Sequence, residues 1–366
     1  MKKMTIVLIT LILITVPQVF AETKNASSLQ ELPPYYNWRD IGGVDYTTPI
    51  KDQSPAPTCE TYALCAVLET LMQYQEGELF EPDLSETHLY FYAGGTYEAG
   101  GVHLQDAADY LVEYGVPDEG CYPDPHRPYD YPFESLPGWE NRTVKIQEWG
   151  WVEKDDEAIK QALIDHGPLV ICISVYTNFM QYCGGIYDTI EGDREGGHLV
   201  ALMGYDDIQH CWIVKNSWGD KWGEDGWIRI SYDVDIFLSP CYGGTGFLYV
   251  DGVYGNFKPD VPRVYIERPD IHYTYILGIR IPTLFRDISS MQKAAPRIFG
   301  RNIVKVSAEN TNKVEFYLDG ELKAVDEKPP YRAVLRTLLG LHTITVLAYN
   351  KAGNMSMDIR DEIIII

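Results

Sequence analysis

An apolar segment at residues 62–71 constrains the fold of this chain most, because its composition predicts a buried helix. Pro57 and Thr58 stand just before it, where helix starts favour a proline and a short polar residue. Cys59 lies at the head of this predicted helix. A thiol there faces unpaired backbone N–H groups and the positive end of the helix dipole, and both favour the nucleophilic thiolate. A free cysteine is more often a small buried hydrophobic residue, so a catalytic interpretation depends on partners elsewhere in the chain.

Two downstream motifs provide such partners. His198 begins the apolar segment HLVALMGY, and Asn216 begins the sequence NSWGDKWGEDGW. Gln53 stands six residues before Cys59. With these motifs in this order, the chain resembles the papain-like cysteine peptidases, whose Cys, His and Asn are also widely separated in sequence.

The resemblance implies a role for each of these residues. Cys59 would attack the peptide carbonyl as a thiolate paired with an imidazolium at His198, which would then protonate the leaving amine. Asn216 would orient the imidazole ring, and Trp218 would shield their hydrogen bond from water. The Gln53 side chain and the Cys59 backbone N–H would form the oxyanion hole.

The resemblance also implies a substrate-binding surface that includes Gly100, Gly101, Gly197 and Trp218. Gly100 and Gly101 end the segment EAGG, where glycine would let a substrate backbone approach closely. A tight turn requires glycine equally, and the two interpretations are compatible.

Glu60 departs from the family pattern, which nearly always has tryptophan directly after the nucleophile. A carboxylate beside a thiolate opposes its ionisation. At a helix N-terminus an acid can instead simply stabilise the helix. We expect Glu60 to shift the subsite preference or the pH optimum without abolishing activity.

The resemblance covers residues 32–257 and implies an α+β fold, a papain-like peptidase domain with a helical lobe, an antiparallel β lobe and the site between them. Helical spacing predicts further helices at residues 105–114 and 155–166. Strand-like segments separated by Gly and Asp clusters lie at residues 169–176, 198–203, 211–215 and 227–231.

A second domain is predicted after a proline-punctuated linker at residues 258–269. Within residues 270–366, short segments with an alternating, strand-like pattern are separated by turn residues. This pattern favours an all-β immunoglobulin-like sandwich. Such a module would act as a spacer or bind a cell-surface or protein partner weakly.

The first 21 residues have a basic start, a short apolar stretch and a small residue at the end, which predicts a secretory signal peptide. A membrane anchor is the alternative, but the apolar stretch is short for spanning. A short segment, residues 22–31, follows. We therefore expect a secreted or cell-surface protein with no membrane span after signal removal. The formal net charge of −23 argues against a nucleic-acid partner.

The chain has seven cysteines, an odd count that fits one reactive thiol with the others paired or buried. A Cys183–Cys241 bridge is one pairing that the sequence leaves open. Cys65 and Cys172 lie on apolar faces, which favours core positions. The histidines outside the motif show no paired metal-ligand spacing, so we expect no metal and no cofactor.

These patterns together favour an exported cysteine endopeptidase that acts on peptide or protein substrates as a monomer. Two alternatives stay open. One is a catalytically impaired papain-like scaffold that serves as a surface-binding or adhesion protein. The other is a thiol transpeptidase or amide hydrolase that acts on cell-wall peptides through the same thioester.

Overall fold

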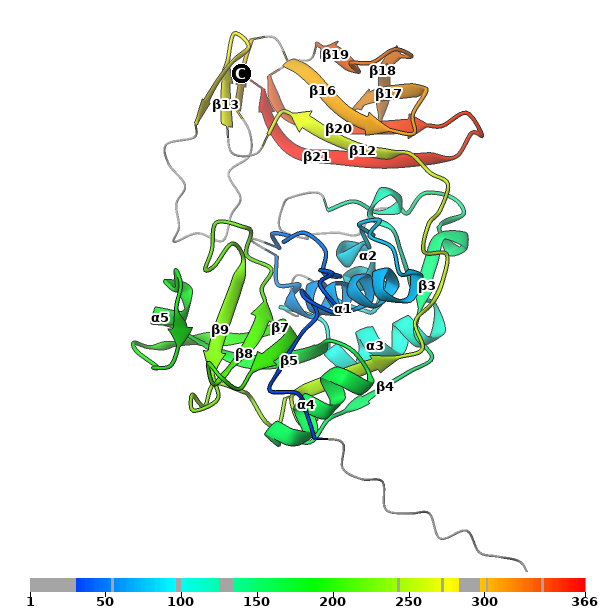
Figure 1. Cartoon of the computed structure of the whole chain (residues 1–366). Helices are drawn as coiled ribbons and strands as arrows, with labels where there is room; N and C mark the ends of the chain where they lie inside the picture. The colour runs from blue at the N-terminus through cyan, green and yellow to red at the C-terminus, as the bar shows by residue number, and fades with distance from the viewer. Residues whose placement is uncertain are drawn as a thin grey trace, which may run out of the picture. The chain divides into compact units, whose positions relative to one another are not determined.

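The structure is a computed structural model that describes residues 31–53, 56–96, 100–124, 134–241, 244–270, 273–282, 297–300, 302–336 and 339–365 (Figure 1). The predicted signal peptide and residues 22–30 lie outside the described residues. The chain divides into two units, Met1–Pro33 and Pro34–Ile366, and the second contains all the described helices and strands. No helix in these described ranges has the length and apolar composition that crossing a membrane requires.

The helical lobe is built around α1, which places Cys59 as its first residue. The lobe's helices are α1 (Cys59–Glu76), α2 (Glu86–Tyr92), α3 (Leu104–Glu113) and the short 3-10 turns Glu119–Cys121 and Trp139–Arg142. Helix α1 ends at Gly77, whose left-handed conformation (φ 62°) suits glycine. Ser85 caps α2 by accepting the backbone N–H of His88 at 3.0 Å. The helices predicted at 62–71 and 105–114 are confirmed.

The β lobe is a mainly antiparallel sheet with strand order β4-β10-β5-β7-β8-β9-β6, and β1 also pairs with β7. Its strands are β1 (Tyr35–Asn37), β4 (Glu148–Trp151), β5 (Leu169–Tyr176), β6 (Ile186–Tyr187), β7 (Arg194–Asp206), β8 (Cys211–Lys215), β9 (Trp227–Ser231) and β10 (Phe247–Asp251). Helices α4 (Asp156–Asp165) and α5 (Thr177–Met180) accompany them. A smaller sheet joins β2 (Val116–Pro117), β3 (Thr143–Lys145) and β11 (Tyr254–Gly255). The four strands and the helix predicted for this lobe are confirmed.

The two lobes meet where α1 packs against β7. Leu64 and Leu68 of the helix share one buried hydrophobic cluster with Leu199 and Met203 of the strand. Burying a leucine side chain stabilises a fold by roughly 1.5–3 kcal/mol. This packing fixes the helix that begins at Cys59 against the strand that carries His198.

The region after residue 262 is all β and forms two sheets, with orders β12-β16-β19 and β14-β13-β15-β21-β20-β17-β18. A shared core includes Ile266, Phe316 and Val346. The strands are β12 (Arg263–Arg268), β13 (Tyr273–Ile276), β14 (Ile279–Pro282), β15 (Arg297–Phe299), β16 (Asn302–Glu309), β17 (Lys313–Leu318), β18 (Glu321–Asp326), β19 (Arg332–Leu335), β20 (Gly340–Tyr349) and β21 (Met355–Ile365). The β region thus begins inside the predicted linker, residues 258–269. The immunoglobulin-like topology stays a prediction.

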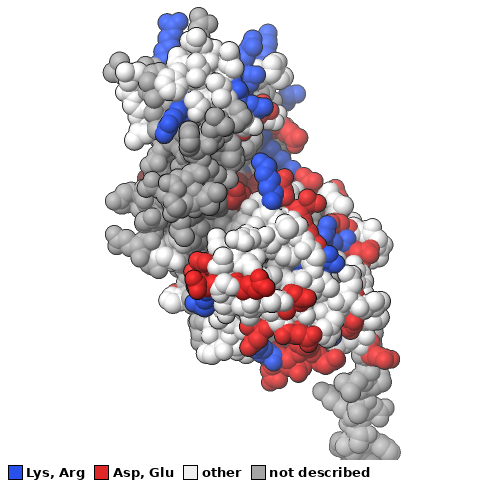
Figure 2. Space-filling view, turned by 90° about the vertical axis from the view of Figure 1, so that its left-hand side faces the viewer, with Lys and Arg blue, Asp and Glu red and all other residues white. Residues whose placement is uncertain are grey.

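The β region differs in charge from the rest of the chain. Residues 258–366 carry 16 Lys and Arg against 13 Asp and Glu, whereas residues 1–257 carry 14 against 40. On the face shown in Figure 2, acidic side chains gather on the lower part and basic side chains at the upper end. Arg263 donates to the carbonyl oxygens of Phe80 and Glu81 at 2.7 and 2.9 Å, and Lys258 pairs with Glu78 at 2.6 Å. Basic side chains just before and at the start of β12 therefore bind acceptors of the helical lobe.

The disulfide in the described structure joins Cys172 to Cys241. The Cys183–Cys241 pairing that the sequence left open is wrong. Cys172 is buried in the core, as predicted, and it is also half of this bridge. Cys172 sits in β5 opposite Leu199, and Cys241 follows the segment that hydrogen-bonds back to β5 through Leu238. Cys183 is exposed and free, while Cys65 is buried, as predicted.

Candidate active site

Cys59, the predicted nucleophile, is half-buried at the start of α1. Leu199 follows His198 in β7, and its backbone N–H is close enough to the sulfur to affect the pKa of the thiol. Burial, and after it the charge of Glu60, raise the pKa of the Cys59 thiol well above its usual value, while the Leu199 N–H lowers it. The helix N-terminus predicts a thiolate, but in the resting site these opposing effects favour the neutral thiol.

His198 is buried and held by two neighbours from one loop. Its Nε2 lies 2.8 Å from Oδ1 of Asn216, and the ring stacks on Trp218 with centroids 4.7 Å apart. The Asn216 oxygen also accepts the backbone N–H of Ser217, which identifies it as an acceptor. Nε2 therefore carries the hydrogen, and Nδ1 is left to accept a proton. Burial lowers the pKa of His198 to about 4, against the opposing effect of the Asn216 hydrogen bond.

Gln53 is oriented by the residue that follows Asn216. Ser217 donates its hydroxyl to Oε1 of Gln53 at 2.6 Å, and the Gln53 backbone N–H bonds the Ser217 carbonyl at 2.9 Å. The Gln53 amide nitrogen donates to the carbonyl of Ala56 at 3.0 Å. An amide nitrogen has two hydrogens, and this bond uses one of them. Ser217 belongs to the quoted motif, but the sequence did not indicate this contact.

The predicted substrate-binding glycines lie on both sides of the candidate site. Gly100 and Gly101 have positive φ values of 68° and 147°, and Gly101 forms a bridge with Thr96. Residues 97–99 lie outside the described residues. Gly197 precedes His198 in β7, and a Cβ there would lie 3.6 Å from Cδ1 of Leu238. Trp218 contacts the His198 ring directly.

The Glu60 carboxylate contacts the sulfur of Cys59. The Glu60 side chain is buried, with only 3% of the residue exposed. Its Oε2 lies 3.6 Å from the Cys59 sulfur, in position to accept the thiol hydrogen. The departure noted in the sequence therefore falls on a group in direct contact with the predicted nucleophile.

Comparison with known proteins decides the family. The model of the family described as "Papain family cysteine protease" matches residues 32–242, more than half of the 366 residues. This chain belongs to the papain family of cysteine proteases.

Individual relatives match the same part of this papain-family chain. The oryzain beta chain of Oryza sativa subsp. japonica is 28% identical over 223 residues, which is 58% of this chain and 45% of the relative. A cathepsin L-like peptidase of Aedes aegypti is 30% identical over 230 residues, which is 60% of this chain and 63% of the relative. Among solved structures, the bromelain protease from Ananas comosus in complex with the E64 inhibitor is 27% identical with a TM-score of 0.50 and covers 60% of this chain and 99% of its own. The chain thus spans less than two thirds of the length of these curated relatives.

A buried polar network links the two lobes behind the site of this papain-family domain. Lys215, next to Asn216, donates from Nζ to the carbonyl and hydroxyl of Thr48 at 2.7 and 2.9 Å. The Thr48 hydroxyl donates to Glu69 of α1 at 2.6 Å, and Glu69 accepts Lys51 at 2.9 Å. Burial lowers the pKa of Lys215 to about 8. The network holds the segment before Gln53 against the strand before Asn216.

Sequence reasoning missed this network, although two signals were available. Glu69 is an acid inside the apolar α1 segment, and Lys215 is a lysine at the end of an apolar strand. A buried charge requires a partner, so each one predicts a hidden contact. Sequence alone gives no way to identify Thr48 as the group between them.

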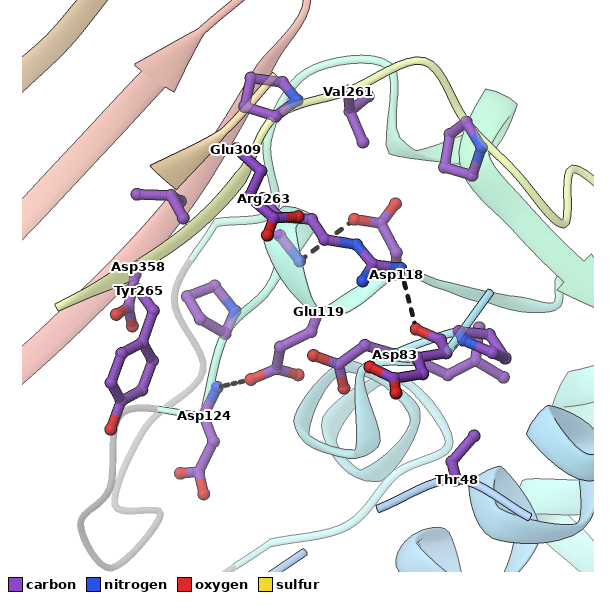
Figure 3. A pocket seen from close by; sticks show the side chains of 18 of the residues that line it. Thr48, Asp83, Asp118, Glu119, Asp124, Val261, Arg263, Tyr265, Glu309 and Asp358 are labelled. Carbon is purple, nitrogen blue, oxygen red and sulfur yellow. Dashed lines mark hydrogen bonds between the residues drawn. The ribbon is translucent and has the colours of Figure 1, made fainter. Parts of the chain in front are cut away.

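A separate pocket of about 1040 Å³ lies between the helical lobe and the β region (Figure 3). Lys51, Glu119 and Arg263 are among its lining residues, and the Asp124 backbone N–H donates to Glu119 inside it at 2.5 Å. None of Cys59, His198 and Asn216 lines it. The pocket is therefore distinct from the candidate active site, although it reaches the Lys51 end of the buried network.

Proposed function

We propose that this chain is a cysteine endopeptidase that hydrolyses peptide bonds through a thioester on Cys59. The observation that carries the proposal is the 2.8 Å contact between His198 Nε2 and Asn216 Oδ1. His198 lies in β7, the strand that packs against the helix beginning at Cys59. A nucleophile beside a base that a third group orients is the arrangement required for acyl transfer.

In the first step, Nδ1 of His198 accepts the thiol proton and the Cys59 sulfur attacks the peptide carbonyl carbon. The carbonyl oxygen becomes an oxyanion, which the Gln53 amide and the Cys59 backbone N–H stabilise. The imidazolium donates its proton to the leaving amine, and the thioester remains on Cys59. Water, deprotonated by His198, then attacks the thioester and releases the acid product.

Asn216 and Trp218 support the base in both steps. The Asn216 oxygen keeps hydrogen on Nε2, so that Nδ1 is the nitrogen that exchanges protons. Trp218 covers one face of the ring and limits the access of water to that hydrogen bond. A hydrogen bond away from water is stronger, because the local dielectric constant is lower.

A catalytically impaired scaffold is the second candidate, and the position of Glu60 favours it. A carboxylate 3.6 Å from the sulfur opposes the formation of a thiolate. In that case the surface-binding function would belong to the C-terminal region. A thiol transpeptidase would share the Cys59 thioester and differ only in the acceptor, so an added amine nucleophile distinguishes it by forming a ligated product.

We also propose that the protein is exported and that its C-terminal region is an immunoglobulin-like sandwich with a cell-surface or protein partner. The basic and apolar pattern of residues 1–21 supports export. The antiparallel strands β16 to β20 lie in two sheets around one core, which supports the proposed sandwich fold. N-terminal sequencing of the exported protein tests the first proposal, since an intact Met1 in the external fraction contradicts it.

The experiment that tests the peptidase function is labelling by a peptidyl epoxide of the E64 class, followed by hydrolysis of a fluorogenic peptide library. Cys59→Ala is assayed beside the wild type. We expect labelling and cleavage in the wild type and neither in the variant. Absence of both from a folded wild-type protein would support the impaired scaffold instead.

A further inference from the structure

The Glu60 carboxylate is enclosed against the sulfur of Cys59. Its Oε2 lies 3.6 Å from that sulfur, and 3% of the residue is exposed. A Cβ placed on Gly101 would lie 3.0 Å from Oε1, so Gly101 lies close to the other oxygen. An acid that only offset the helix dipole would not need to contact the sulfur. This side chain instead lies between the nucleophile and a predicted substrate-binding segment.

Described titratable side chains near this pair include one from α2 and one from β7. Tyr90 of α2 is close enough that, after burial, the Glu60 charge contributes to raising the pKa of Tyr90 to about 12. His198 of β7 precedes Leu199, whose N–H is close to the sulfur, and burial lowers the pKa of His198 to about 4. Neither group supplies a positive charge to Glu60 at neutral pH. The Glu60 carboxylate and the Cys59 sulfur are in contact at 3.6 Å.

We propose that Glu60 controls the reactivity of Cys59 by exchanging hydrogen-bond roles with it. As a carboxylate, Glu60 accepts the thiol hydrogen and keeps Cys59 in the unreactive form. As a carboxylic acid, Glu60 donates its own hydrogen to the sulfur and supports the thiolate. This role rests on the proposed function, because it takes Cys59 as the reacting group.

The proton balance is simple. On acidification, one proton moves from solvent to Glu60. The thiol proton then passes from Cys59 to Nδ1 of His198, and the sulfur, now a thiolate, accepts the hydrogen bond of the Glu60 carboxylic acid. On a return to higher pH, Glu60 gives its proton back to solvent, and the thiolate recovers a proton from the imidazolium. No bond to carbon forms or breaks.

The expected sign follows from repulsion between like charges. A thiolate beside an ionised carboxylate is unfavourable, and the penalty is large where water is excluded. Cys59 should therefore become less reactive as Glu60 ionises with rising pH. The peptidase would then be restricted to acidic surroundings by a residue next to its nucleophile, without any change in His198 or Asn216.

The test compares alkylation of Cys59 by iodoacetamide in the wild type and in Glu60→Gln, from about pH 4 to about pH 9. Glutamine keeps the shape of the side chain and cannot ionise. We expect similar rates at the acid end, and a rate for Glu60→Gln about tenfold or more above the wild type near pH 7, where one pKa unit corresponds to a factor of ten. Glu76→Gln, at the exposed end of the same helix, is the matched control and should follow the wild type.

A ratio of rates that stays constant over the whole pH range would overturn the proposal. A second measurement, the ultraviolet absorbance of the thiolate in the wild type with Cys59→Ser as the blank, needs no change at Glu60. The thiolate absorbance should fall as the pH rises from acid to neutral, and it should increase again only in alkali. A steady increase of this absorbance from acid to alkali would contradict the role of Glu60. Alkylation does not require peptide hydrolysis, so expected profiles without peptide cleavage would leave this role intact and refute the proposed function.

Discussion

The two walls of the candidate active site are built differently. The sheet wall consists of His198, Asn216 and Trp218, which are joined by a 2.8 Å hydrogen bond and a ring stack. The helix wall consists of Cys59 and Glu60 at the start of α1, where a buried acid lies 3.6 Å from the sulfur. The sheet wall follows the family motif at each position, and the helix wall departs from it directly after the nucleophile.

This contrast separates geometry from electrostatics. The sheet wall fixes the position and the tautomer of a base, and it depends on contacts between β7 and the segment that follows the neighbouring strand β8. The helix wall sets the charge state of the nucleophile, which one adjacent side chain can change without moving the backbone. A family can therefore keep its catalytic geometry while the pH range of each member varies.

The largest effect is expected from removing the base of the sheet wall. His198→Ala leaves the Cys59 thiol without a proton acceptor, and kcat should fall by about 10⁴ or more. His210→Ala, which removes an exposed imidazole paired with Asp233, is the control and should leave kcat unchanged. Steady-state cleavage of a fluorogenic peptide measures both variants. If His198→Ala kept a rate near that of the wild type, the sheet wall would have no part in catalysis.

The next largest effect on kcat is expected from a substitution in the loop before the helix wall. Gln53→Ala removes one donor of the proposed oxyanion hole, and such a loss costs about 10²–10³ in kcat. KM should change little, because the donor acts on charge that develops in the transition state. Ser217→Ala should produce a smaller fall in the same direction, since Ser217 only orients Gln53 through a 2.6 Å bond. A rise in KM with kcat unchanged would place Gln53 in substrate binding instead.

The network that joins the walls should affect stability. Glu69→Gln removes a buried carboxylate that accepts hydrogen bonds from Thr48 and Lys51. Lys51 keeps its ion pairs with Asp83 and Glu86, so the unfolding free energy should fall by about 1.5–3 kcal/mol, the contribution of hydrogen bonds to a charged group. Chemical denaturation measures the change. Glu76→Gln on the same helix removes an exposed pair with Lys258 and should cost about 0–1 kcal/mol. Equal losses in the two variants would show that the Glu69 network contributes nothing special.

The sequence predicted the elements of this site better than their contacts. Strands 169–176, 211–215 and 227–231 match β5, β8 and β9 to the residue, because apolar runs bounded by turn residues have sharp ends. The motif residues His198, Asn216 and Trp218 are in contact, while their roles stay predictions. The Thr48–Lys215 contact spans 167 positions, and no local pattern reports it. The Cys172–Cys241 disulfide was also not predicted. A cysteine on an apolar strand is predicted to be buried whether or not it forms a disulfide.

The charge state of the thiol was the other element that sequence reasoning could not predict. Helix position alone favours a thiolate at Cys59. Burial and the direction of the Glu60 side chain, which lies close to both the sulfur and Gly101, favour the neutral thiol instead. Side-chain direction is a property of packing, which a single sequence does not contain.

The smallest effect is expected at one of two buried histidines, His88 in the helical lobe and His198 in the β lobe. His198 has the Asn216 hydrogen bond, whereas both ring nitrogens of His88 in α2 are buried without a hydrogen-bond partner among the described residues. Burial lowers the pKa of His88 to about 3, below the value of about 6.5 for an unfolded histidine. Between these values the unfolded state binds more protons, so this residue makes the fold lose stability as the pH falls from about 6.5, by up to about 1.4 kcal/mol per pH unit.

His88→Phe should therefore flatten the acid side of the stability curve, because phenylalanine keeps the stacking on Tyr92 and Trp139 and cannot bind a proton. Urea denaturation from about pH 4 to about pH 7 measures the slope. His210→Phe, at an exposed site, is the matched control and should keep the wild-type slope. A His88→Phe protein that lost stability toward acid as steeply as the wild type would mean that the acid sensitivity arises elsewhere. His198, the one buried histidine of the sheet wall, would then be the first residue to examine.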